Sequence, residues 1–135
     1  MKKINWKKAS GEVIGFTIGL LFLLSFFSQM IGVFIYSAHK EELNDAVMRI
    51  GRSLVTEESI EDAQKKAEEV MNAYMVDREY MPLDEMSIFV DYSPGSKKEW
   101  TKGNFITVSM AAHIKSGCLM TPGTTIVSTM VMIER

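Results

Sequence analysis

The chain has 135 residues and a formal net charge of −2, with 47% hydrophobic and 24% charged residues. This length holds one small domain at most. A disulfide scaffold is excluded because Cys118 is the only cysteine. A nucleic-acid binder is disfavoured because such proteins carry a basic surface, whereas the residues after 37 include 11 basic and 16 acidic side chains.

A charge-free run of 25 residues extends from Val13 to Ser37. As a helix it would be about 37 Å long, against a hydrocarbon core of about 30 Å. The sequence therefore predicts a transmembrane helix over 13–37. The alternative is a cleaved secretory signal, whose apolar core has about 7–15 residues and precedes small residues at the cleavage site. The run is longer than such a core. Its best candidate cleavage site, Ile35-Tyr36-Ser37-Ala38, has bulky residues where small ones are required.

Residues 1–12 form a basic leader, in which four lysines outweigh the single acid Glu12. Lys40 is the nearest basic residue beyond the run. Because positively charged flanks stay on the cytoplasmic side, we expect a cytoplasmic amino terminus and an extracytoplasmic remainder. The prediction is a single-pass cell-membrane protein.

Small and polar residues gather toward one side of the predicted membrane helix. At 100° per residue, Ser25, Ser28, Gln29, Gly32 and Tyr36 share a stripe, with Gly15 and Gly19 at its edge. Small residues let membrane helices approach closely, and a glutamine in hydrocarbon favours a hydrogen-bonding partner. We interpret the stripe as a surface that packs against other membrane helices. The alternative is chance, since glycine and serine are common in membrane spans.

Residues 38–81 are predicted to form a helical stalk and a second helix. The stalk continues the membrane helix, with apolar residues at helical spacing, and ends or bends at 55–58. Ser59 and Asp62 resemble a capping box that begins the second helix. The apolar positions are Leu43, Ala46, Val47, Ile50 and Leu54 in the stalk and Ile60, Ala63, Ala67, Val70, Met71 and Tyr74 in the second helix.

Residues 82–135 are predicted to form a small β-meander head. Apolar residues alternate with polar ones over 86–92, 106–114 and 124–133, and the connecting segments have turn composition. Three such strands favour an antiparallel sheet, with one face packed on the second helix. The expected fold class is therefore α+β.

The sequence offers little chemistry. His39 and His113 are the only histidines and are far apart, and the glycines include no phosphate-binding loop. We expect no metal, cofactor or catalytic residue, and no specific role for Cys118. The enzymatic alternative is a membrane-anchored enzyme that uses Cys118 as nucleophile and His113 as base.

The order of elements resembles a pilin-type architecture, and more closely the TadE-like family of minor pseudopilins from tight-adherence (Tad) pilus systems. Three segments carry the resemblance: Gly11-Glu12-Val13-Ile14-Gly15-Phe16, Leu43-Asn44-Asp45-Ala46 through Gly51-Arg52, and Thr125-Ile126-Val127-Ser128 to Ile133-Glu134. The resemblance implies a non-enzymatic role in assembling a pilus or secretion apparatus. The implied partners are membrane lipid, other pilin-like subunits, assembly platform proteins and a prepilin peptidase.

Processing by that peptidase would occur after Gly11 and leave Glu12 at the new terminus. Family members place the glutamate several residues after the glycine, and here it follows directly. A second candidate site, Gly15-Phe16-Thr17-Ile18, has Leu20 rather than glutamate at the fifth position after the glycine. Uncleaved anchoring is the alternative. The functional alternative is a single-span accessory or sensor protein whose head binds a partner or ligand.

Overall fold

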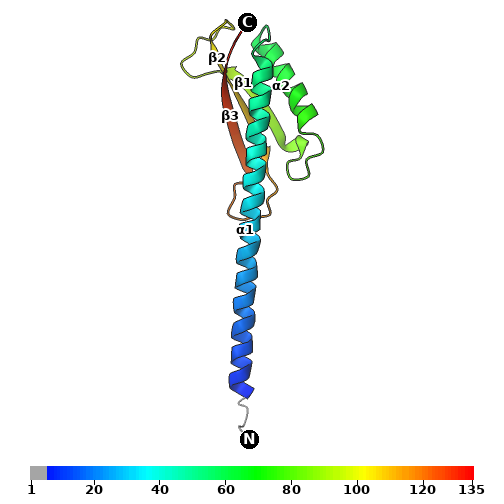
Figure 1. The fold of residues 1–135 in the computed structure, drawn as a ribbon, viewed down its shortest axis with the longest axis vertical. Helices are drawn as coiled ribbons and strands as arrows, with labels where there is room; N and C mark the ends of the chain where they lie inside the picture. Colours follow the sequence, from blue (N-terminus) through cyan, green and yellow to red (C-terminus); the bar gives the residue numbers. More distant parts are fainter. Residues whose placement is uncertain (1–5) are drawn as a thin grey trace.

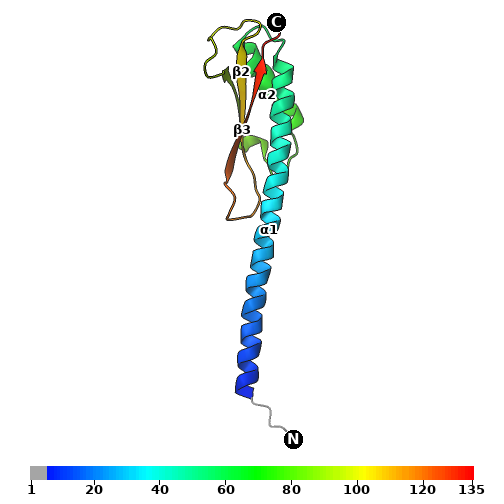
Figure 2. The same cartoon turned by 60° about the vertical axis from the view of Figure 1, so that its left-hand side comes forward.

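The computed structural model describes residues 6–135 and has a long helix with a small α+β head along its far end (Figure 1). The elements are α1 (Trp6–Leu54), α2 (Ile60–Tyr74), a short 3-10 turn (Leu83–Glu85), β1 (Met86–Tyr92), β2 (Phe105–His113) and β3 (Thr124–Met132). The first part of α1 projects below the head as a bare rod, and its last part lies along the sheet (Figures 1 and 2). The predicted α+β layout is confirmed.

Helix α1 is continuous over 49 residues and passes without a break through the predicted boundary between membrane helix and stalk. Gly51 near its end costs about 1 kcal/mol of helix propensity relative to alanine. A β-carbon at Gly51 would lie 3.0 Å from both Thr129 Cγ2 and Val131 Cγ1. The glycine therefore lets α1 lie close against β3.

Helix α2 begins at the predicted cap. Ser59 Oγ accepts a hydrogen bond from the Asp62 backbone N–H at 3.1 Å and donates one to Asp62 Oδ2 at 2.7 Å. The apolar side of α2 is buried at Ala63, Ala67 and Met71. Local capping and apolar spacing thus account for where this helix begins and which side faces inward.

The sheet has the order β1-β2-β3, with both pairs antiparallel. Its inner face carries Ile88, Met110 and Val127 in register, and all three are buried. Both α1 and α2 pack on the sheet, α2 against β1 and α1 against β2 and β3. The sequence pattern predicts only the second helix on this face, and the structure adds α1.

The free edge of β1 is covered by a side chain from α2. Gln64 Nε2 donates to the Ile88 carbonyl at 2.9 Å, and Gln64 Oε1 accepts from the Val90 N–H at 2.9 Å. An unpaired strand edge invites pairing with another chain. Gln64 therefore protects one edge of the sheet and fixes α2 against β1.

Candidate functional site: the apolar rod and its junction with the head

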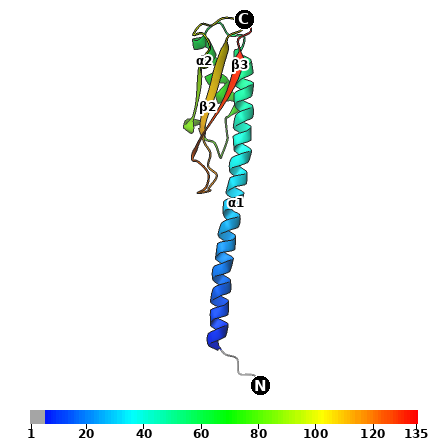
Figure 3. The same cartoon turned by 90° about the vertical axis from the view of Figure 1, so that its left-hand side faces the viewer.

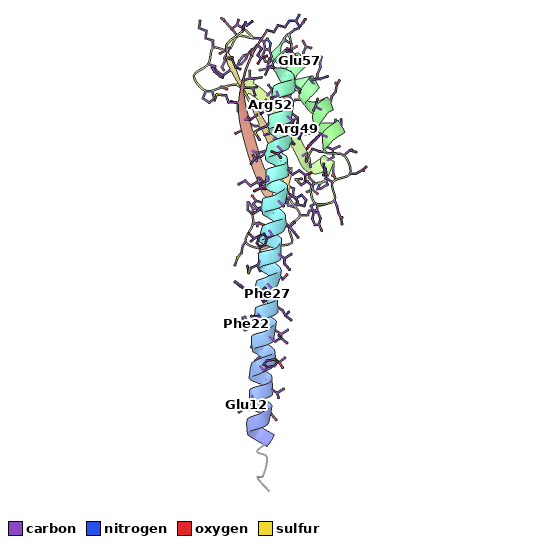
Figure 4. The ribbon with its side chains drawn as sticks, viewed as in Figure 1. Glu12, Phe22, Phe27, Arg49, Arg52 and Glu57 are labelled. Carbon is purple, nitrogen blue, oxygen red and sulfur yellow. The ribbon has the colours of Figure 1, made fainter. Side chains whose placement is uncertain are left out.

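The rod is the lower part of α1, and its described side chains from Ser10 to Ser28 are exposed. The most apolar stretch of the helix has a mean hydropathy of 2.2 over 18 residues, and only 6% of that stretch is buried. Phe22 is 74% exposed, and both Phe22 and Phe27 lie on the bare rod below the head (Figure 4). A soluble protein would bury such a helix in its core. This helix is long and apolar enough to cross a membrane.

The rod meets the head at Gln29. Its side-chain oxygen accepts a hydrogen bond from the Leu119 backbone N–H at 3.0 Å and another from the Cys118 thiol at 3.2 Å. Both donors belong to the loop between β2 and β3. The partner that a glutamine in an apolar helix needs is therefore supplied by the same chain.

Gly32, one turn further on, is buried under the same loop. A β-carbon at position 32 would lie 2.5 Å from Cys118 Cβ and 3.1 Å from the Ser116 carbonyl oxygen. In the structure, Gly32 and Gln29 of the predicted stripe contact a loop of their own chain. The absence of a side chain at Gly32 leaves room for the loop, and the side-chain oxygen of Gln29 accepts hydrogen bonds from it.

Tyr36 extends this junction upward. Its hydroxyl is hydrogen-bonded to Thr125 Oγ1 over 2.6 Å, at the start of β3. Positions 29, 32 and 36 have the same three-and-four spacing as the buried positions 43, 47, 50 and 54. That unbroken spacing was the sequence signal for one continuous head-facing side, and dividing the helix at residue 37 concealed it.

The other predicted site residues lie on the rod. Nothing outside the helix comes within 4 Å of a β-carbon built at Gly11, Gly15 or Gly19. Ser25 and Ser28 are exposed, as is Glu12 near the lower end of α1 (Figure 4). These positions face open space and are accessible to lipid, to another helix or to a processing enzyme.

Cys118 and His113 interact with different groups. The Cys118 thiol donates to Gln29, whereas His113 Nε2 lies 4.0 Å from a carboxylate oxygen of Glu85. Lys115 Nζ lies 3.4 Å from the other oxygen of Glu85. Cys118, to which the sequence assigned no role, is thus part of the contact between loop and helix. Among residues 6–135, no group of three or more potential ligands is placed to hold a metal ion.

No protein-family model matches this chain, and no curated protein or solved structure is significantly similar to it. Function is therefore inferred from the geometry of the rod and the head.

The sheet face turned away from the helices is the second exposed apolar surface. Phe89, Ile126 and Met130 point outward and are 60%, 71% and 57% exposed. Asp91 is the single carboxylate or ammonium group among the outward-pointing strand residues of this described sheet. We call this surface the outer sheet face.

Proposed function

We propose that this chain is a non-enzymatic, membrane-anchored, pseudopilin-like subunit that takes part in assembling a Tad or type IV-like pilus or secretion apparatus. The observation that carries the proposal is the form of α1. One uninterrupted helix is a bare apolar rod over its first part and the central core helix of a small α+β head over its last part.

A rod of this kind suits a subunit that leaves a membrane for an assembly. Before assembly, its apolar side chains lie in lipid, because exposing aromatic and aliphatic surface to water is unfavourable in free energy. In the assembly, the same side chains pack against helices of neighbouring subunits. Gly15 and Gly19 have open space around them, and glycines four residues apart allow two helix backbones to approach closely.

The leader supports the direction of insertion. Four lysines precede the charge-free run, and the head follows it, so the positive-inside tendency favours a cytoplasmic amino terminus and an extracytoplasmic head. Gly11 and Glu12 lie at the lower, exposed end of the rod. That location is compatible with cleavage after Gly11 at the cytoplasmic edge of the membrane and with uncleaved anchoring.

The proposal is tested in the organism that encodes the chain. Deletion should abolish or reduce piliation and surface adhesion, and a wild-type copy should restore both. The tagged protein should co-purify with pilus or membrane-platform proteins, and terminal sequencing of the mature chain reports cleavage at Gly11. Normal piliation and adhesion after deletion would contradict the proposal.

The outer sheet face favours a second candidate, a single-span accessory or sensor protein whose head binds a partner. Replacing Ile126 and Met130 with lysine leaves the buried inner face unchanged, because both side chains point outward. If the chain is such a sensor, the double variant should fold and insert normally but no longer bind its partner. Deleting the whole chain should then leave piliation unchanged. Under the pseudopilin proposal, deletion itself impairs piliation.

A further inference from the structure

The loop between β2 and β3 carries the most exposed apolar side chains of the head. Leu119 is 94% exposed and Met120 is 78% exposed. No charged residue occurs in the 18 positions from Ser116 to Ile133. Two adjacent bare apolar side chains at a loop tip, in a segment without charge, mark a surface suited to an apolar partner or to lipid.

This loop reaches further down α1 than any other part of the head (Figures 1 and 3). Its level along the helix is set by the hydrogen bond from the Leu119 N–H to Gln29. If the hydrocarbon core begins at Val13, Gln29 lies about 24 Å into a core about 30 Å thick. Tyr36, which meets Thr125, lies about 35 Å along the helix and therefore outside the core.

Backbone N–H groups at the tip of the loop have hydrogen-bond partners within the chain. Its consecutive N–H groups all donate to side chains of the chain: Cys118 to Ser116 Oγ at 3.2 Å, Leu119 to Gln29 at 3.0 Å, and Met120 to Cys118 Sγ at 3.4 Å. An unsatisfied backbone group costs several kcal/mol in hydrocarbon. These three hydrogen bonds lower the free-energy cost of placing the tip near the acyl chains.

Charged groups of the head lie above this level. Arg78 pairs with Glu42, which is 13 residues beyond Gln29 on α1, and the Lys115 backbone N–H bonds to the Tyr80 carbonyl. Lys115 also pairs with Glu85. These ion pairs therefore lie above one uncharged loop, and that arrangement matches a membrane surface with its headgroups above and its acyl chains below.

We propose that the β2–β3 loop is a second membrane anchor, with Leu119 and Met120 inserted among the acyl chains of the outer leaflet beside α1. The insertion depth is about 6 Å, in the range of interfacial segments. It fixes the tilt and rotation of the head on the membrane. The proposal rests on the transmembrane placement of the rod in the proposed function.

The test uses the full chain in vesicles of phosphatidylcholine and phosphatidylglycerol. Cys118→Ser removes the native thiol and keeps a hydroxyl donor toward Gln29. Single cysteines are then introduced as Leu119→Cys, as Phe22→Cys in the middle of the rod, and as Lys97→Cys in the turn after β1. Each is labelled with an environment-sensitive NBD probe, and quenching is measured with lipids spin-labelled near the headgroup or deep in the acyl chain.

We expect the probe at position 119 to shift to the blue and to be quenched best by the shallow spin label. The probe at position 22 should be quenched best by the deep label, and the probe at 97 by neither. Quenching at 22 without quenching at 119 would overturn the second anchor and leave the rod in the membrane. Absence of quenching at 22 would overturn the membrane placement itself. Because Leu119 is almost fully exposed, its replacement does not disturb the fold.

Discussion

Gly32 of α1 lies directly against Cys118 of the β2–β3 loop, so closely that a β-carbon at position 32 would lie 2.5 Å from Cys118 Cβ. Helix and loop meet there because position 32 has no side chain. Gly19, further down the same helix, has open space around it. Two glycines of one apolar helix thus have different surroundings. Gly32 contacts a loop of the same chain, whereas Gly19 lies on the exposed surface.

The first prediction concerns this contact. Gly32→Leu should push the loop off the helix and break the hydrogen bond from the Leu119 N–H to Gln29. Amide hydrogen exchange in detergent micelles should then become faster at Leu119 and unchanged in β2. Gly19→Leu is the matched control and should leave exchange at Leu119 as in the wild type. Equal exchange in the wild type and in Gly32→Leu would show that position 32 does not hold the loop.

A second prediction separates insertion of the rod into the membrane from association between rods of different chains. Replacing Gly15 and Gly19 together with leucine should weaken contacts between rods, because bulky side chains keep two helix backbones apart. Leucine is more apolar than glycine, so extraction with alkaline carbonate should still leave the protein in the membrane. Crosslinking between rods is the measurement. Leu21→Ile and Leu24→Ile, on the side of the helix away from the two glycines, are the control. Crosslinking that survives the glycine replacements would rule out this pair as a contact.

The third prediction concerns the bond between Tyr36 and Thr125. The hydroxyl groups are 2.6 Å apart and partly buried, and the residues are 89 positions apart in the sequence. Tyr36→Phe should lower the free energy of unfolding by about 1 kcal/mol, the typical net value of one hydrogen bond. Thr125→Val tests the other partner. In a double-mutant cycle the two effects should not add, and additive losses would mean that the pair does not interact.

The fourth prediction concerns the packing of α1 on the sheet. Gly51→Leu should force the helix away from Thr129 and Val131, and overpacking of this kind costs about 1–3 kcal/mol. Thermal unfolding followed by circular dichroism in detergent measures the loss. Met48→Leu, at an exposed position of the same helix, is the control and should change the unfolding midpoint little. An unchanged midpoint for Gly51→Leu would contradict the close approach of α1 to β3.

The sequence by itself determined the elements and their order, because those follow from local patterns. Spacing of three and four defined the helices, alternation defined the strands, and Ser59 with Asp62 marked the start of α2. The 25-residue charge-free run alone indicated that one helix could cross a membrane. Each of these signals lies within a few residues of the structure that it specifies.

Only the tertiary structure decided what the polar stripe of α1 contacts. Gln29 bonds to Leu119, which is 90 positions away, and Gly32 is covered by Cys118. A glutamine and a glycine in an apolar helix have the same local signature whether they meet another chain or their own. The spacing of positions 29, 32 and 36 indicates only that they continue the head-facing side of α1. Which segment covers them depends on how the whole head folds back along the helix.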